Sequence, residues 1–238
     1  MNFVFQIILA LLPGVSIALY IHFRDKYEPE PVGLLVLSFF LGVVGMFIAW
    51  GLTIAIEQFV WIDEHDLQQQ AVHAFLMVAF VEESSKFLFA RGVLFRNSNF
   101  DEPFDGIVYT VMIGMGFASA ENILYVVEGG GSTAIVRMFT AVPAHGLFAV
   151  LMGYYLGKAK FHTNRIFLYS VVALVVATLF HGVYDYFLFI SFVPGIWIGA
   201  VIAFAVAFVL SRNAIRIHQQ ASPFKMKQSQ GKPKISES

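Results

Sequence analysis

The sequence predicts an all-α membrane protein with about seven transmembrane helices. Hydrophobic residues make up 58% of the chain and charged residues only 13%, whereas soluble domains carry about 25% charged residues. The mean hydropathy is +0.73, and the apolar residues gather in stretches of the length that crosses a bilayer, about 20 residues each. The chain has no cysteine, which excludes disulfides, thiol nucleophiles, iron–sulfur clusters and cysteine-based zinc sites.

The predicted spans follow one another along most of the chain. No basic segment precedes the first stretch and no small-residue cleavage site is evident, so we expect a retained helix rather than a signal peptide. Pro194 predicts a break between the last two stretches, because proline lacks a backbone donor and fixes φ. The spans are expected near residues 2–21, 33–56, 71–90, 105–127, 134–157, 165–190 and 194–211.

The placement of Lys and Arg predicts the orientation. Thirteen of the 15 basic residues lie in the first, third and fifth loops and in the C-terminal tail, whereas the loop at 57–70 is acidic. The positive-inside rule then places the N-terminus outside and the C-terminus in the cytoplasm. We expect one domain over residues 1–211 and a basic, disordered cytoplasmic tail over 212–238. The thirteen residues are Arg24, Lys26, Arg91, Arg96, Lys158, Lys160, Arg165, Arg212, Arg216, Lys225, Lys227, Lys232 and Lys234.

The third span carries charge in its middle, at Glu82, Glu83 and Lys86. A charged residue at the centre of a membrane helix costs about 2.5–3.5 kcal/mol, and each Leu, Ile, Phe or Val returns only about 0.3–0.6 kcal/mol. Neighbouring helices must therefore supply partners, so this segment faces a polar interior. An ionisable cluster at such a depth is by default a hypothesis for a functional site.

Further polar groups occur in the next three spans. Glu121 and Asn122 lie in the fourth, His145 lies in the fifth, and His181 and Asp185 lie in the sixth. His181 and Asp185 share one helix face because they are four residues apart. With a rise of about 1.5 Å per residue, Glu82, Glu121, His145 and His181 all fall roughly 9–17 Å below the outer surface. Four helices thus offer carboxylates, imidazoles and an amide at one level.

This combination of groups suits hydrolysis. A carboxylate in a site of low dielectric can act as a general base toward water, and Lys86 can keep one glutamate ionised. Asp185 can fix the tautomer of His181, and Asn122 can donate to a developing oxyanion. Glu and His also suit a zinc site with an open water position, for which His145, His181 and Glu121 are candidates. The spacing matches no compact metal motif, so it leaves open whether a metal is bound.

Other polar and small residues are expected to have structural roles. Arg137 is expected to anchor a helix end at the membrane interface. Four glycines are expected to mark close helix packing, and five histidines near helix ends are expected to be solvated. These residues are Gly114, Gly116, Gly153 and Gly157, and His22, His65, His73, His162 and His218.

Four blocks of sequence resemble the PrsW family of bacterial intramembrane proteases, a distant relative of the CAAX prenyl-protease and bacteriocin-processing superfamily. They occur in the expected order on successive helices. In the wider superfamily a histidine takes the place of Glu121 and an asparagine often that of Asp185, so these two residues match the PrsW branch. The blocks are Glu82-Glu83-Ser-Ser-Lys86, Phe117-Ala-Ser-Ala-Glu121-Asn122, His145 and His181-Gly-Val-Tyr-Asp185.

The resemblance implies a multi-pass peptidase of the bacterial plasma membrane that cuts a single-span membrane protein. Family members make the first cut in membrane-bound anti-sigma factors. The carry-over assigns Glu82, Glu83 and His181 as essential, with Glu82 as the base, and adds Glu121 and His145 as catalytic candidates. Lys86, Asn122 and Asp185 would support them. It leaves open whether glutamate alone or a metal such as zinc activates water, and it implies no nucleic-acid partner.

Three alternatives predict other properties. An ion- or proton-coupled transporter would also place carboxylates inside the membrane, but no inverted repeat of broken helices is evident. A retinal-type receptor would carry its lysine on the last helix, and residues 194–211 contain none. A CAAX-type prenyl protease would favour access from the cytoplasm, whereas the predicted cluster lies toward the outside.

Overall fold

The computed structural model is an all-helical bundle. It describes residues 3–225 and, within this range, all side chains except those of residues 3, 128, 130, 131 and 134. The α-helices are α1 (Phe3–Arg24), α2 (Val32–Glu57), α3 (Leu67–Val72), α4 (Phe80–Gly92), α5 (Asp105–Phe139), α6 (Ala141–Phe161), α7 (Ile166–Phe189) and α8 (Trp197–Gln220), with a π-helix η1 (His73–Ala79) and short 3₁₀ turns η2 (Leu94–Arg96) and η3 (Thr163–Arg165).

Six helical stretches of the described chain are long and apolar enough to cross a membrane, and each overlaps an expected span. The remaining expected span, 71–90, is helical as well, but it is divided among α3, η1 and α4 and carries the charged residues. The six stretches are Val4–Arg24, Val32–Glu57, Asp105–Val127, Ile135–Phe161, Thr163–Phe189 and Trp197–Gln220.

The first half of α5 forms the centre of the bundle. Every residue from Phe104 to Ala120 is buried, as expected for a helix that is surrounded on all sides. Helices α1, α2, α4 and α6 pack around it. The chain then reverses direction between Val127 and Ile135. The evidence is the contact between Arg137 and Glu121, which a straight helix would separate by about 24 Å.

Glycine allows the backbones around α5 to approach closely. A Cβ atom on Gly42 of α2 would lie 1.9 Å from the Ile113 carbonyl oxygen, and one on Gly116 of α5 would lie 1.8 Å from that of Phe39. The expected packing role of the other glycines is confirmed as well. A Cβ atom would lie 2.8 Å from Ala149 Cβ at Gly114, 2.1 Å from Thr110 Oγ1 at Gly153 and 2.3 Å from the Pro103 carbonyl oxygen at Gly157.

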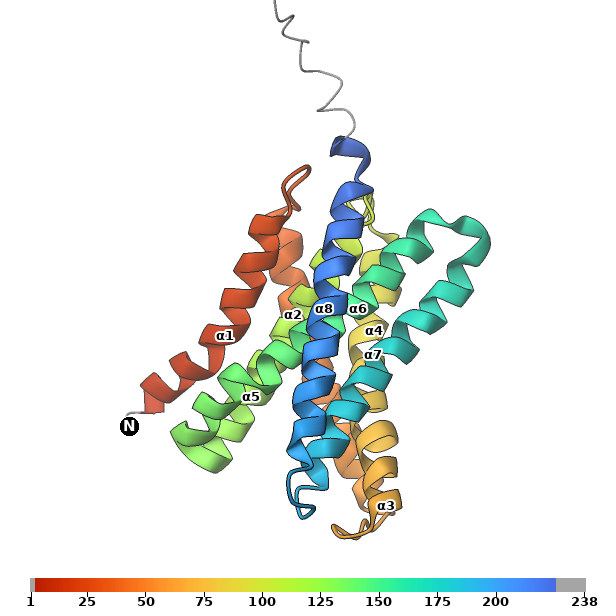
Figure 1. Cartoon of the computed structure of the whole chain (residues 1–238). Helices are drawn as coiled ribbons and strands as arrows, with labels where there is room; N and C mark the ends of the chain where they lie inside the picture. Colours follow the sequence, from red (N-terminus) through yellow and green to blue (C-terminus); the bar gives the residue numbers. More distant parts are fainter. Residues whose placement is uncertain (1–2, 226–238) are drawn as a thin grey trace, which may run out of the picture.

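The two ends of the bundle differ in their content of Lys and Arg, which gather at one end, among them Lys26, Arg96 and Arg165. We call the end with loops 25–31, 93–104 and 162–165 the basic end, and the end with loops 58–66 and 190–196 the acidic end. Figure 1 shows the α1–α2 loop at the same end of the bundle as the C-terminal end of α8, and α3 at the opposite end. Helix α8 continues through Gln220 because Ala214, Ile215 and His218 are buried against the bundle, so the tail expected from residue 212 begins later. Residues 226–238 of that tail lie outside the described residues.

Hydrogen bonds between acidic and hydroxyl side chains close the basic end. Asp25, Glu30 and Glu102 are buried there. Asp25 accepts from the Glu30 backbone N–H at 3.1 Å, and Glu30 accepts from the Tyr109 hydroxyl. Glu102 accepts from the hydroxyl of Ser222, the second residue after α8. These contacts tie the α1–α2 loop to α5, and the segment after α8 to the loop before α5.

We expect Gly42→Ala to destabilise the protein by about 1–3 kcal/mol, the usual cost of overpacking, because its methyl group would collide with the α5 backbone. Gly51→Ala is the matched control on α2, since no atom lies within 4 Å of its Cβ position. Thermal unfolding in detergent micelles measures both changes. Equal midpoints for the two variants would contradict the close α2–α5 approach.

We also expect the basic end to loosen as the pH rises through about 7. Burial is the main cause that raises the pKa of Asp25 to about 7 and that of Glu30 to about 7, and neighbouring carboxylates add to it. A carboxyl whose pKa is higher in the folded than in the unfolded state stabilises the fold at low pH and loses that contribution as it ionises. The unfolding temperature should therefore fall as the pH rises from about 5 to about 7 and level off above that. Asp25→Asn combined with Glu30→Gln should flatten this dependence, and an unchanged slope would contradict it.

Candidate active site

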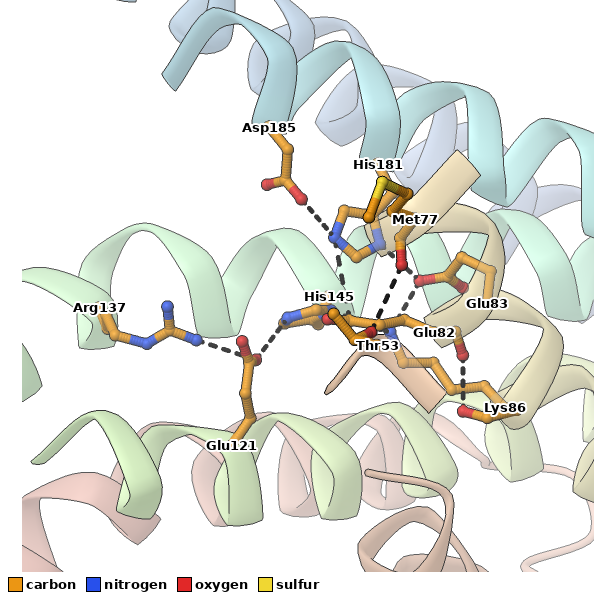
Figure 2. A network of polar contacts seen from close by, with 11 residues as sticks. Thr53, Met77, Glu82, Glu83, Lys86, Glu121, Arg137, His145, His181 and Asp185 are labelled. Carbon is orange, nitrogen blue, oxygen red and sulfur yellow. Dashed lines mark hydrogen bonds and ion pairs between the residues drawn. The ribbon is translucent and has the colours of Figure 1, made fainter. Parts of the chain in front are cut away.

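The structure brings the predicted polar residues of four helices into one network (Figure 2). Glu82, Glu83 and Lys86 come from α4, Glu121 from the first half of α5, His145 from α6, and His181 and Asp185 from α7. The contacts between them, described below, show that these groups lie at one level of the bundle. That arrangement was expected from their positions along the predicted spans.

A π-helix directly precedes the two glutamates. Such segments are rare and occur often at functional sites, because the extra residue per turn changes the direction of the side chains that follow. Thr53 of α2 donates to the carbonyl of Met77 within η1, at 3.4 Å. Gly182 lies against the Phe75 ring, which a Cβ atom would approach to 2.4 Å, so this glycine allows α7 to approach η1 beside His181. The sequence carried no signal for the π-helix.

Lys86 is the cation at the centre of the network. Its Nζ lies 2.7 Å from Glu83 Oε1, 3.5 Å from Glu82 Oε2 and 3.0 Å from His145 Nδ1. It also lies 4.1 Å from the centroid of the Phe117 ring. The side chain is 4% exposed, so these contacts replace water around the ammonium group.

His145 is held between a cation and an anion. Lysine has only donors, so His145 Nδ1 accepts from the Lys86 ammonium. Its Nε2 then carries the proton and donates to Glu121 Oε2, at 2.9 Å. This pair of contacts fixes both the tautomer and the orientation of the ring.

His181 contacts carboxylates through both ring nitrogens. Nδ1 lies 2.9 Å from Glu83 Oε1, and Nε2 lies 3.0 Å from Asp185 Oδ2. The ring stacks on Phe148, with centroids 5.1 Å apart, and its Nε2 is 4.0 Å from Glu82 Oε2. The expected contact between His181 and Asp185 is present, and Glu83 provides a second one.

Arg137 belongs to this network, although the sequence led us to expect an interfacial anchor. Its Nη2 lies 2.8 Å from Glu121 Oε2 and its Nε donates to Asn122 Oδ1 at 3.2 Å. The guanidinium also lies 3.8 Å from the Tyr125 ring centroid. The reversal of the chain after Val127 produces these contacts. The one sequence signal was that Arg137 is a basic residue at the acidic end, against the positive-inside pattern.

Asn122 is placed differently from the role expected of it. Its Nδ2 donates to the backbone carbonyl of Ala10 in α1, at 3.1 Å, and its Oδ1 accepts from Arg137. Both ends of the amide are therefore engaged in joining helices. The residue holds Arg137 and α1 in place and does not present its donor to a substrate.

A cavity of about 420 Å³ adjoins the network. Glu82, whose side chain is 13% exposed, lines this cavity, whereas Glu83, at 1%, lies behind it with Lys86. The two adjacent glutamates thus have different surroundings: one faces space for water and substrate, and the other faces only protein groups. The other polar residues that line the cavity are Thr53, Glu57, His73, Glu121, Tyr125, Arg137, His145, His181, Tyr184 and Asp185.

Glu82, His145 and His181 offer a metal-binding set, since one ligand atom of each lies within 4.8 Å of the others. A carboxylate with two imidazoles is a donor set of catalytic zinc sites, which keep a fourth position for water. Glu121, Glu83 and Asp185 hold the two imidazoles, as outer carboxylates do in such sites. The donor types suit a divalent metal, which would replace one of the present contacts of each imidazole, because both nitrogens of His145 and of His181 have protein partners here. Of the expected candidates, His145 and His181 belong to this set and Glu121 does not; Glu82 is the carboxylate within reach of both imidazoles.

Two histidines expected to be solvated are placed elsewhere. His218 is buried and stacks on Tyr154, with ring centroids 4.5 Å apart. His73 lines the cavity and stacks on Phe189 at 4.9 Å. Both lie near helix ends, as the sequence indicated, but at ends that are covered by neighbouring helices.

Comparison with known proteins gives a consistent family. The model of the PrsW family of intramembrane metalloproteases matches residues 30–215. A protein named Protease PrsW from Geobacillus kaustophilus is 38% identical over 176 residues, which cover 74% of this chain and 76% of that protein. Its namesake from Bacillus subtilis is 38% identical over 179 residues, covering 75% and 80%, and that from Clostridioides difficile is 30% identical over 192 residues, covering 78% and 79%. No solved structure matches the chain.

We expect Lys86→Met to destabilise the protein by about 3–5 kcal/mol, because it leaves buried carboxylates without their cation. Adding Glu83→Gln to Lys86→Met should recover much of the loss, since the amide keeps an acceptor for His181 and removes the unpaired charge. Equilibrium unfolding in detergent micelles measures both. A single variant as stable as the wild type would contradict the central role of Lys86.

Proposed function

The chain belongs to the PrsW family of intramembrane metalloproteases, and from this we propose that it adds water to a peptide bond of a single-span membrane protein near the outer surface of the membrane. The observation that carries the proposal is the placement of Glu82. Of the two adjacent glutamates, Glu82 is the one that lines the cavity, and two imidazoles lie beside it.

We further propose seven spans with the N-terminus outside. The helical backbone runs without interruption from Leu67 to Gly92, about 39 Å at 1.5 Å per residue, which is enough to cross a bilayer as the seventh span. The basic end then faces the cytoplasm. The cavity reaches Glu57 and Phe189, the last residues of α2 and α7 at the acidic end, which supports access from the outside.

In the proposed reaction Glu82 acts as the general base. It takes a proton from a water molecule as the water oxygen attacks the peptide carbonyl carbon, and it passes that proton to the leaving nitrogen. Glu83 is proposed to hold His181 and Lys86 in place. Arg137 and Glu121 are proposed to orient His145. A carboxylate has two oxygens, so Glu82 can offer one to a metal and keep the other for the proton.

We propose zinc as the metal, held by Glu82, His145 and His181. When bound there, it would lower the pKa of water and polarise the carbonyl. We propose a substrate of the anti-sigma factor type, cut on its outer side, because the resemblance of the four sequence blocks implies this substrate class. The bacterial membrane location of the chain is consistent with such a role.

We expect Glu82→Gln to lower the cleavage rate by about 10²- to 10⁴-fold, the contribution of a general base, while the protein still inserts and folds. The experiment maps new N-termini in membranes that express equal amounts of wild type or variant. Asp101→Asn, which also changes an acid to its amide but lies at the basic end, should cleave like the wild type. Retained cleavage by Glu82→Gln would overturn the assignment of Glu82. The metal content of purified wild type, Glu82→Gln and His181→Ala tests the metal separately, and equal content in all three would contradict the proposed ligands.

A further inference from the structure

A second cavity lies next to the cavity beside Glu82, at the acidic end. Three residues, Glu57, His73 and Phe189, line both. The second cavity has a volume of about 330 Å³, and we call it the vestibule. Because the two cavities share lining residues, they are neighbours, separated by the side chains of these three residues. The other residues that line the vestibule are Val60, Trp61, Ile62, Glu64 and Gln70.

The shared residues mark the junction between the two cavities. Glu57 ends α2, His73 begins η1 and Phe189 ends α7. His73 stacks on Phe189 with an interplanar angle of 28°. Its Nε2 lies 3.9 Å from Glu57 Oε1, which is too long for a hydrogen bond. The Glu57 side chain is 49% exposed, so its carboxylate is available to a group that passes through the junction.

The charge of the vestibule is one-sided. Glu57 and Glu64 line it, and no Lys or Arg is among its described lining residues. In the inner cavity the basic lining residue is Arg137, which is already paired with Glu121. Trp61, which is 82% exposed, adds an aromatic face. Carboxylates combined with an aromatic face suit a lysine or arginine side chain.

We propose that the vestibule is a binding subsite for a lysine or arginine side chain of the substrate, on the outer side of the bond that is cut, and that Glu57 determines this specificity. The inference rests on the proposed function, since it assigns the vestibule to the peptide that Glu82 hydrolyses. Glu57 is preferred over Glu64 because it lines both cavities. Any chain between the vestibule and Glu82 therefore passes it.

The test uses the full-length protein in proteoliposomes with a series of single-span reporters. Each reporter carries Lys, Ser or Glu at one position of its outer juxtamembrane segment, and the position is moved along the segment. At one register the wild type should cleave the Lys reporter about fivefold faster than the Glu reporter, the size expected of a partly exposed ion pair. Glu57→Gln should remove this preference, and Glu57→Lys should reverse it.

Asp63→Asn is the matched control. Asp63 lies in the loop that follows Glu57 and carries the same charge, but it does not line the vestibule, and the amide can still accept from the His65 backbone N–H. It should keep the preference for Lys. If Asp63→Asn weakens the preference for Lys as much as Glu57→Gln does, the preference comes from the total negative charge of this region, and the proposed subsite is overturned. No preference at any register overturns it as well.

A binding measurement separates this inference from the proposed function. In the Glu82→Gln protein, reporters with a photoreactive group beside the scanned position should crosslink to residues 57–73 more strongly with Lys than with Glu. If the wild type cleaves no reporter but this crosslinking difference appears, the proposed function fails and the subsite stands. If the wild type cleaves all reporters equally and the crosslinking shows no charge dependence, the function stands and the subsite falls.

Discussion

A single buried ammonium group holds the centre of this protein together. Lys86 contacts Glu82, Glu83 and His145 at once. Apart from the polar network, the helices around it are packed through apolar side chains. Isolated charges in such surroundings are costly, and removing one partner of a buried pair leaves the other uncompensated. The network therefore persists only if α4, α5, α6 and α7 are all in place. The same requirement fixes the imidazoles and carboxylates relative to one another.

Close helix packing makes that network possible. Side chains from four helices reach common partners only where the backbones lie near one another, and glycine provides this at the α2–α5 and α5–α6 contacts. Gly182 does the same between α7 and the π-helix, next to His181. In a bilayer, packing of small residues takes over part of the role that the hydrophobic effect has in water. The glycines are thus a structural condition for the site even though they carry no chemistry.

The two ends of the bundle are organised differently around this centre. At the basic end, hydrogen bonds among Glu30, Tyr109, Glu102 and Ser222 join loops that are far apart in sequence. At the acidic end, Glu57 lines both the cavity beside Glu82 and the vestibule. A protease that works within the membrane must admit water and peptide to its centre while the rest of the bundle stays closed. The asymmetry of the two ends meets that need, with the opening on the side that we assign to the outside.

The sequence by itself determined the helical class, the position of most spans and the identity of Glu82, Glu83, Lys86, Glu121, His145, His181 and Asp185 as one polar group. It could do so because apolar length and the cost of charge in a membrane are properties of short segments. The tertiary structure alone decided which of the two adjacent glutamates faces the cavity, which carboxylate lies near enough to His145 and His181 to share a metal with them, and that Arg137 lines the cavity while Asn122 joins it to α1. Those outcomes depend on the π-helix before Glu82 and on the reversal of the chain after Val127. Both set side-chain directions through contacts between helices, and no local pattern of residues specifies such contacts.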